Sequence, residues 1–310
     1  MRRIALALAV VAMGASAHGA LPGNFPGGTN WVVHFDVENL MSSGLGDKVQ
    51  ERLALPRNQR LLKAAEVVFG IRLPDDMKSI TLAGCGHDQE KAVVYFSGNF
   101  DEKRLVTLAS LAKDYETTEH AGRTIHIWKD PGRPGPGPFA RGEFTVHAVF
   151  AREGLIVMSR GLETLKDAID ALDGSSAGVD FSGRVDADAF FTLVAVDLHK
   201  LPPRKPGALV LSYLTDVHYS LKATDADVLG AFAAEITDAE TAARILDVLE
   251  GLQAIVELHP EGYPEVAGLI RSVEFSAEGT TVSASGSAGI EQLAEIAENL
   301  RQIHRELMGL

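Results

Sequence analysis

The chain has 310 residues, with 42 acidic and 29 basic side chains, a formal net charge of −13 at pH 7 and a hydrophobic fraction of 46%. An acidic chain lacks the basic surface that a phosphate backbone requires, so the composition argues against nucleic acid as a partner. The single cysteine excludes an internal disulfide, and the core must therefore be held by ordinary apolar packing.

Residues 1–17 have the pattern of a secretory signal peptide. Arg2 and Arg3 give a positive start, an apolar run of about ten residues follows, and Ala15 and Ala17 stand at the small positions before a cleavage point. A buried helix or a membrane anchor is the alternative, but the run is too short to span ~30 Å of hydrocarbon. We therefore expect export to the periplasm or the extracellular space, with no transmembrane segment after signal cleavage.

Residues 31–40, WVVHFDVENL, alternate in side-chain character with a period of two, which predicts a half-buried strand. The pattern returns at residues 191–201, FTLVAVDLHKL. With an offset of 161 residues, Val194 falls on Val33. The second segment therefore predicts a second copy of the first strand.

An apolar run followed by an acidic helix start also occurs twice. It is GNFDEKRLVTLASLAK at residues 98–113 and EITDAETAARILDVLEGL at residues 235–252. With an offset of 137, Phe232 falls on Tyr95 in the preceding apolar runs. Each copy predicts a strand that leads into a capped helix.

The two predicted helices begin with different capping devices. Asp101 is predicted to be the N-cap of the first helix, with Phe100 and Leu105 at the positions of a hydrophobic staple. In the second helix, Thr237 and Glu240 have the spacing of a capping box.

A third pair consists of a hairpin and a following helix, at residues 144–174 and 270–300. With an offset of 125, Gly154 falls on Gly279 at the predicted hairpin tips. The helices that follow align with an offset of 128 after a small insertion. Three matched blocks in the same order predict an internal duplication; two unrelated α+β halves are the alternative.

The predicted fold class is α+β, with two similar halves, each an antiparallel sheet with helices packed on one face. Residues 131–142, PGRPGPGPFARG, fit neither a sheet nor a helix and are predicted to be a loop inserted in the first half only. The predicted organisation is a signal peptide at 1–17, a linker at 18–30, a first half at 31–174, a linker at 175–190 and a second half at 191–310.

Cys85 follows a β-rich run in TLAGCGHDQ, and His87 lies close to it. A reactive thiol is one interpretation. A free cysteine is more commonly a small buried hydrophobe, and no cationic cluster adjoins this one, so we expect inert packing.

Two serine motifs resemble a nucleophile elbow, in which a strand precedes the serine and a helix follows it. Ser176 in GSSAG has the reverse context. Ser287 in SGSAG has the better one, although Ser285 replaces the first glycine of the motif and His304 is the only histidine downstream. A plain helix cap at Ser287 is the simpler interpretation.

The ten histidines show no metal-binding spacing of the H-E-x-x-H kind. His126 and His147 are placed to face each other across a hairpin, where they could ligate zinc with a carboxylate. His120 lies six residues before His126, too far to share a metal along one strand. Hydrogen-bonded imidazoles are the simpler interpretation.

Paired carboxylates could hold Ca²⁺ or act as acid and base, but none has the glycine and spacing of an EF-hand loop. Solvent-facing positions are the simpler interpretation. The pairs are Asp36 with Glu38, Asp75 with Asp76, Asp186 with Asp188, and Asp225 with Asp227.

The stretch from WVVHFDVENLMSSGLGDKV through FGIRLPDDMKSITLAG and AVVYFSGNFDEKRL to TIHIW resembles uncharacterised secreted proteins of planctomycete-type bacteria. The resemblance covers mainly residues 31–130. It implies export and carries no known activity, ligand or catalytic residue.

Two functions fit the sequence. The first is an exported, non-enzymatic binding or structural protein with an unknown protein or small-molecule ligand, held on the sheets or between the halves. The second is a periplasmic or extracellular hydrolase that uses Ser287 or a His/carboxylate cluster. A continuous apolar groove favours the first, and a convergent Ser, His and Asp set favours the second. The sequence identifies no catalytic residue, metal ligand or cofactor.

Overall fold

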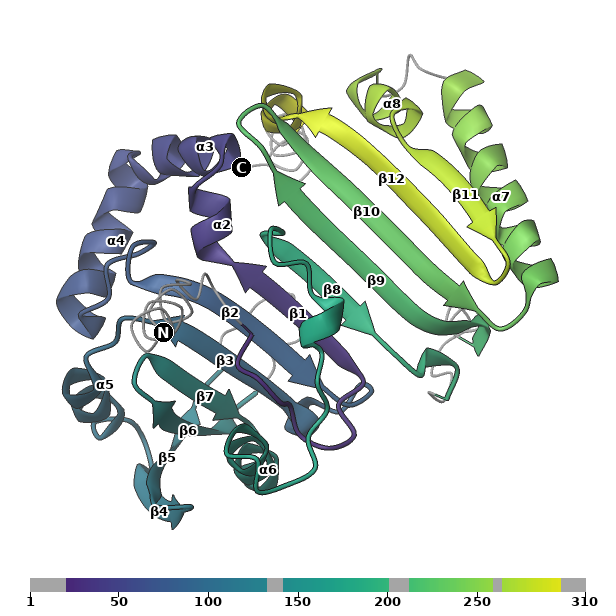
Figure 1. The fold of residues 1–310 in the computed structure, drawn as a ribbon. Coiled ribbons are helices and arrows are strands. Elements are labelled where there is room, and N and C mark those ends of the chain that lie inside the picture. Colours follow the sequence, from purple (N-terminus) through teal and green to yellow (C-terminus); the bar gives the residue numbers. More distant parts are fainter. Residues whose placement is uncertain (1–20, 133–141, 201–211, 259–263, 297–310) are drawn as a thin grey trace, which may run out of the picture.

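The computed structural model describes residues 21–132, 142–200, 212–258 and 264–296, and it is built on one twelve-stranded antiparallel sheet (Figure 1). The strands are β1 (Trp31–Asp36), β2 (Met77–Gly84), β3 (Ala92–Gly98), β4 (Glu116–His120), β5 (Arg123–Asp130), β6 (Phe144–Arg152), β7 (Leu155–Ser159), β8 (Phe191–Ala195), β9 (Leu214–Ala223), β10 (Asp227–Ile236), β11 (Glu274–Glu278) and β12 (Thr281–Gly289). The helices are α2 (Val37–Met41), α3 (Gly44–Leu53), α4 (Pro56–Phe69), α5 (Glu102–Ala109), α6 (Leu162–Leu172), α7 (Ala239–Leu258) and α8 (Pro264–Arg271). The predicted signal peptide and residues 133–141 of the Gly/Pro-rich loop lie outside the described residues.

The two halves of the sheet have corresponding strand orders. From the middle of the sheet outward, the first half runs β1-β2-β3-β7-β6 and ends in the β5–β4 hairpin, while the second runs β8-β9-β10-β12-β11. The halves meet where β1 pairs with β8, with Val32 opposite Val194. The α+β class and antiparallel pairing are confirmed, but the halves share one continuous sheet instead of each forming its own.

We name the two faces of the sheet after the helices that cover them. On the α6 face, Val93, Tyr95 and Val157 are buried against Leu165 and Ile169 of α6. Directly paired residues of neighbouring strands point to the same side, so the register carries this assignment across the whole sheet.

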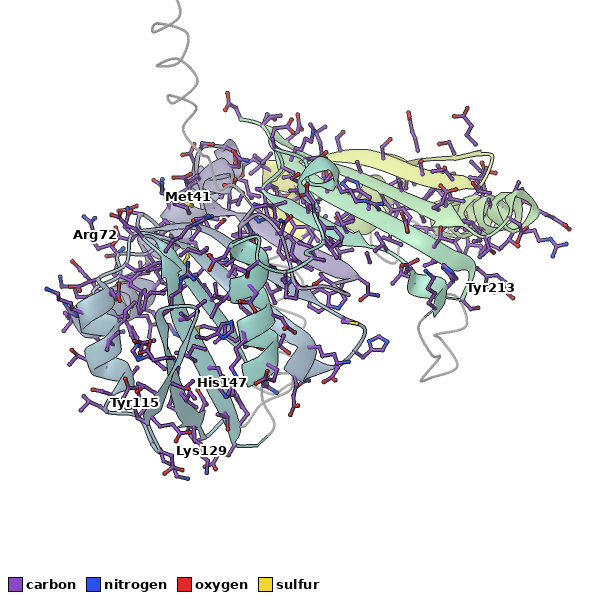
Figure 2. The ribbon with its side chains drawn as sticks, turned by 60° about the horizontal axis from the view of Figure 1, so that its bottom comes forward. Met41, Arg72, Tyr115, Lys129, His147 and Tyr213 are labelled. Carbon is purple, nitrogen blue, oxygen red and sulfur yellow. The ribbon has the colours of Figure 1, made fainter. Side chains whose placement is uncertain are left out.

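The α7 face is the opposite side. There Ala234 and Val282 pack against Ala242 and Ile245 of α7. In the first half this face is covered by α5, which lies over Phe96. The prediction of helices on one face is therefore wrong for the first half, which has α5 and α6 on opposite sides. Figure 2 shows the second half extending sideways from the first, with α7 at its far end.

The residue pairs aligned by sequence do not share a face. Val33 points to the α7 face, but Val194 lies opposite Val32 and points to the α6 face. Tyr95 is on the α6 face, whereas Phe232 packs on the α7 face. Because side chains alternate along a strand, these alignments are out of structural register by an odd number of residues.

The helices after the two hairpins also differ in position. The helix that begins at Ile290 places Ile290 and Leu293 against Phe35 and Phe191 on the α7 face. Its sequence counterpart, α6, lies on the other side. The predicted match between these two helices is therefore wrong.

The predicted positions of the helix starts and hairpin tips agree better with the structure. Asp101 caps α5 by accepting a hydrogen bond from the backbone N–H of Arg104, as predicted. In α7, Asp238 does the same for Thr241 at 2.8 Å, so the predicted Thr237/Glu240 capping box is wrong. Gly154 and Gly279 both adopt positive φ, 73° and 59°, at the tips of their hairpins.

Parts of the predicted linkers pack into the core of the α6 face. The backbones of Phe25 and Val179 exchange two hydrogen bonds of 3.0 and 2.9 Å. The Phe25 ring meets Tyr95 and Phe181 edge to face, with ring centroids 5.5 and 5.8 Å away. Residues 21–30 and 175–190 therefore pack on the α6 face of the sheet.

Candidate functional site

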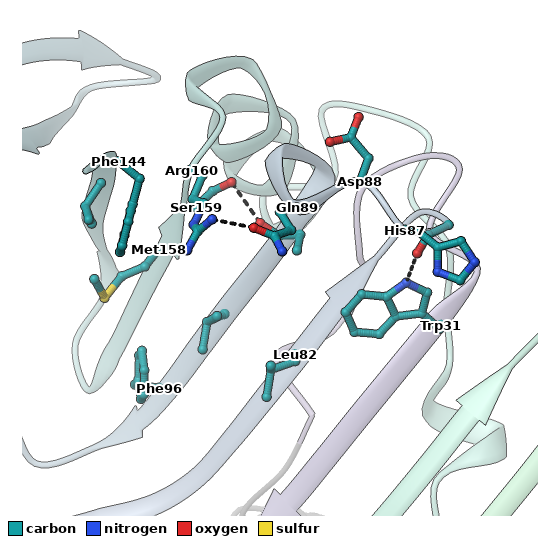
Figure 3. Close-up of a pocket in the computed structure, with 14 residues that line it drawn as sticks. Trp31, Leu82, His87, Asp88, Gln89, Phe96, Phe144, Met158, Ser159 and Arg160 are labelled. Atoms are coloured by element: carbon teal, nitrogen blue, oxygen red, sulfur yellow. Dashed lines mark hydrogen bonds between the residues drawn. The ribbon is translucent and has the colours of Figure 1, made fainter. Parts of the chain in front are cut away.

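An apolar cavity of about 430 Å³ opens on the α7 face of the first half, beside the short helix η1 (Gln89–Lys91) (Figure 3). We call it the first cavity. Its floor comes from five neighbouring strands and consists of Trp31, Leu82, Val94, Phe96, Val146 and Met158. These side chains alternate with residues that point to the α6 face, so β3 is apolar on both of its sides.

The rim of the first cavity is polar and largely self-satisfied. The Trp31 indole N–H donates to the carbonyl oxygen of Gly86 at 3.0 Å. The carboxylate of Asp88 accepts from the backbone N–H of Glu90 at 3.1 Å, which caps η1. Glycine is needed at Gly84, because a Cβ there would collide with the Trp31 ring.

Arg160 closes one end of the rim. One guanidinium N–H donates to the side-chain oxygen of Gln89. The guanidinium carbon lies 4.0 Å from the centroid of the Phe144 ring, a cation–π contact.

A second cavity of about 420 Å³ lies under α5 and shares Phe96 and Met158 with the first. Its other walls are mostly apolar and include Phe69, Ile71, Phe100, Leu105, Trp128, Phe150 and Ile156. His126 also lines it; its Nδ1 lies 2.8 Å from the Tyr115 hydroxyl, and burial lowers its pKa, which favours the neutral ring. The two cavities together form an apolar strip along the α7 face.

A third cavity, of about 380 Å³, lies on the same face of the second half. Tyr219, Leu221 and Phe232 form its floor, and Leu269 of α8 forms a wall. Each half therefore has at least one apolar cavity on the α7 face.

Ser287, the candidate nucleophile of the hydrolase alternative, does not have the required context, and the simpler interpretation of it as a helix cap is also wrong. Ser287 lies inside β12, where it is exposed, and its carbonyl oxygen accepts a hydrogen bond from Ser272. Ser176 lies in the turn after α6, where its backbone N–H donates to the Asp170 carbonyl. His304 lies outside the described residues.

The first cavity also contains a serine, a histidine and an aspartate, but they do not converge. The Ser159 hydroxyl donates to the Ala92 carbonyl at 2.9 Å and accepts from the Gly161 N–H at 3.2 Å. Figure 3 shows Ser159 beside Gln89 and Arg160, and His87 apart from them beside Trp31. A nucleophile needs a base within hydrogen-bond reach, and this serine is committed to the backbone.

His126 and His147 do not face each other across the hairpin, so the zinc alternative is wrong. In the β5–β6 register His126 pairs with Ala148, and His147 pairs with Ile127, so the two imidazoles point to opposite faces. Burial lowers the pKa of His147 on the α6 face. The described residues contain no group of three or more His, Cys, Asp or Glu side chains that could hold a metal ion.

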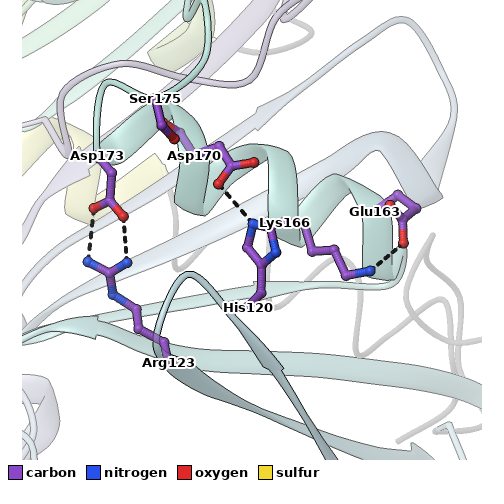
Figure 4. Close-up of polar contacts among 7 residues, drawn as sticks. All are labelled: His120, Arg123, Glu163, Lys166, Asp170, Asp173 and Ser175. Carbon is purple, nitrogen blue, oxygen red and sulfur yellow. Dashed lines mark hydrogen bonds and ion pairs between the residues drawn. The ribbon is translucent and has the colours of Figure 1, made fainter.

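His120 belongs to a structural contact (Figure 4). Its Nε2 lies 2.8 Å from a carboxylate oxygen of Asp170, so it links β4 to α6. Arg123 donates two hydrogen bonds of 2.6 and 2.9 Å to Asp173 at the end of the same helix. Hydrogen bonding by Arg123 lowers the pKa of Asp173. These contacts fasten the β4–β5 hairpin to α6.

The carboxylate pairs are divided among local roles. Asp36 caps α2, with its side chain accepting from the Asn39 N–H at 2.8 Å. Asp76 forms an ion pair with Arg72, and Asp188 forms one with Lys222 at 2.8 Å. Cys85 is a free thiol just after β2 and is half-buried, less enclosed than predicted.

The cavity residues were not predicted as a site. The available signal was the run AVVYFS, which is apolar on both strand faces and therefore calls for a second covering layer. In the structure α5 covers only part of that second face.

No protein-family model and no curated protein matches the chain. Three crystal forms of TP0453, a Treponema protein, are similar in structure. Crystal form III has a TM-score of 0.45 at 11% identity, covering 89% of this chain and 96% of that one. Forms I and IV have TM-scores of 0.41 and 0.43 at 11% and 12% identity, covering 93% and 88% of this chain and 99% and 96% of theirs. Neither the identities nor the TM-scores are high enough to assign a function to this chain.

Proposed function

We propose that the protein is a non-enzymatic binding protein whose ligand is an apolar small molecule held in the first cavity. The observation that carries this proposal is the joined strip of two cavities of about 430 and 420 Å³ that share Phe96 and Met158. Each has the size and apolar lining of a small-molecule site. Exposed apolar surface in such a cavity costs free energy until a ligand or partner covers it.

The hydrolase alternative has less support. Ser287 is an exposed residue within β12, and Ser159 is hydrogen-bonded to the backbone. Among the described residues, no helix is both long and apolar enough to cross a membrane.

The proposal can be tested with N-phenyl-1-naphthylamine, a neutral apolar dye whose fluorescence rises in an apolar site. Val94→Trp fills the first cavity with an indole ring. Leu229→Trp is the matched control, because Leu229 is exposed on β10 and lines none of the three cavities. Circular dichroism and thermal melting establish that both variants fold.

We expect saturable dye binding by the wild-type protein and by Leu229→Trp, and a loss of about tenfold or more in Val94→Trp, since the ring displaces most of the contact area. Absence of binding by the wild type, or equal binding by folded Val94→Trp, would contradict the proposal. Leu221→Trp, which fills the third cavity, shows whether residual binding comes from the second half.

We also propose that residues 1–17 are a signal peptide and that the mature protein is periplasmic or extracellular. The support is the charge and apolar pattern of that segment. The resemblance to secreted proteins of planctomycete-type bacteria is consistent with it. N-terminal sequencing of the exported protein should begin at or near His18, and a mature protein that still begins at Met1 would contradict it.

An internal duplication is likewise our proposal. Its support is the common strand order of the two halves and the same aspartate cap on α5 and α7. The opposite placement of α6 and the last helix speaks against an unmodified copy.

A further inference from the structure

Arg160, which lines the first cavity, has an unused hydrogen-bond donor. It follows β7 directly, on the same face as Met158. Nη1 donates to Gln89, and the guanidinium carbon rests on the Phe144 ring. Nη2 is buried and has no hydrogen-bond partner among the described residues.

A buried guanidinium donor without an acceptor is unfavourable, because it has lost water and gained nothing in exchange. Buried polar groups in folded proteins are nearly always satisfied, so an unsatisfied one at a cavity wall points to a missing acceptor. The carboxylate of Asp88, which also lines the cavity, accepts a hydrogen bond from the N–H of Glu90, and no described residue accepts one from Arg160 Nη2. Among the described residues nothing supplies this acceptor, and the head group of a bound ligand would supply it.

We propose that the ligand of the first cavity is an anionic amphiphile, whose apolar chain lies over Leu82, Val94 and Phe96 and whose head group accepts a hydrogen bond from Arg160 Nη2. This inference rests on the proposed function of the same cavity. A carboxylate suits the site, because a charge-assisted hydrogen bond to guanidinium is short and strong. Phe144 and Gln89 hold the guanidinium in place, so little order must be gained on binding.

The test compares decanoate with decan-1-ol, two probes with the same chain length and different head groups. Each displaces N-phenyl-1-naphthylamine from the wild-type protein, from Arg160→Gln, and from the control Arg184→Gln, whose guanidinium pairs with Asp216 away from this cavity. The wild type should bind decanoate about tenfold more tightly than decan-1-ol, the ratio expected for one charge-assisted hydrogen bond. Arg160→Gln should remove that preference and leave decan-1-ol binding within about twofold, because the apolar contacts remain. Arg184→Gln should retain the preference.

Equal binding of both probes by the wild type would overturn the anionic head group and leave the apolar site standing. Binding of neither probe, together with no dye binding, would overturn the proposed function as well. A folded Arg160→Gln protein that keeps the preference for decanoate would assign the head group to another residue. The preference of the wild type tests the anionic head group whether or not that variant folds.

Discussion

At the scale of single residues, Asp76 is a buried carboxylate held by one neighbour. Arg72 donates to it three times, from its backbone N–H at 2.8 Å, from Nε at 3.2 Å and from Nη2 at 2.9 Å. The side chain of Asp76 is 7% exposed, whereas that of Arg72 is 64% exposed. These hydrogen bonds lower the pKa of Asp76 below its ordinary value of 3.8.

A depressed carboxyl pKa adds stability above the unfolded value, and that stability is lost as the pH falls through the folded-state pKa. We therefore expect Asp76→Asn to lower the free energy of unfolding by about 1 kcal/mol at pH 7, discounted for the solvent-exposed arginine. The difference from the wild type should shrink below pH 4. Urea denaturation at pH 7 and pH 3 measures both; a constant difference would contradict this account.

Substitution of Tyr95 should change the free energy of unfolding in the opposite direction. Its side chain is 1% exposed, burial raises its pKa, and its hydroxyl has no hydrogen-bond partner among the described residues. Tyr95→Phe should therefore leave the free energy of unfolding unchanged or raise it by up to about 1 kcal/mol. Tyr115→Phe is the control, because it breaks the contact with His126 and should destabilise. A marked loss of stability in Tyr95→Phe would show that the hydroxyl is satisfied.

The sequence was informative about residues whose roles are local. The cap at Asp101 depends on a few neighbouring residues and was predicted correctly. Whether the side chains of His126 and His147 point to the same face depends on the β5–β6 register. A register shift of one residue moves a side chain to the opposite face of the sheet. That register is set by tertiary packing, so the zinc hypothesis could not be decided from the sequence.

At the scale of elements, the connection between β5 and β6 is the segment that we predict to be an insertion in the first half. The ends of the loop are close together, because a Cβ added at Gly132 would collide with the backbone of Gly142. Replacing residues 133–141 with a short Gly-containing turn should leave the melting temperature nearly unchanged, since loop closure depends weakly on length. Phe181→Ala is the contrasting control, because it empties a 1% exposed core position and should cost about 3–5 kcal/mol. A loop replacement that unfolds the protein would show that the loop is structural.

The existence of most elements could be predicted, but not the face on which each helix packs. Periodicity shows that residues 162–172 form an amphipathic helix, and it shows the same for the helix beginning at Ile290. Leu165 nevertheless packs on the α6 face and Leu293 on the α7 face. The face on which each helix packs depends on which other residues cover that face. On the α6 face, these residues include Phe25 and Phe181.

At the scale of the whole molecule, the two halves are joined by backbone and by side chains. The β1–β8 ladder makes the sheet continuous. Leu40 and Phe35 of the first half share an apolar cluster with Phe190, Val228 and Ile290. Pairing between strands so distant in sequence is not encoded by local pattern, so two separate sheets were predicted.

This junction predicts cooperative unfolding. Differential scanning calorimetry should give one transition, with calorimetric and van't Hoff enthalpies in agreement, because unfolding of either half would break the β1–β8 pairing on which the other half depends. Val194→Lys, which places a charge in the buried ladder, should lower the midpoint of the whole transition. Two resolved transitions in the wild-type protein would show that the halves are independent domains.

A crystal structure of the protein soaked with 10-bromodecanoate, with the bromine located by anomalous scattering, would show whether the first cavity binds an anionic amphiphile. We expect a bromine peak over the apolar floor of the first cavity, near Val94 and Phe96. We also expect a carboxylate oxygen within hydrogen-bond distance of Arg160 Nη2. A bromine peak only in the third cavity, or an empty first cavity at saturating ligand, would contradict the proposal.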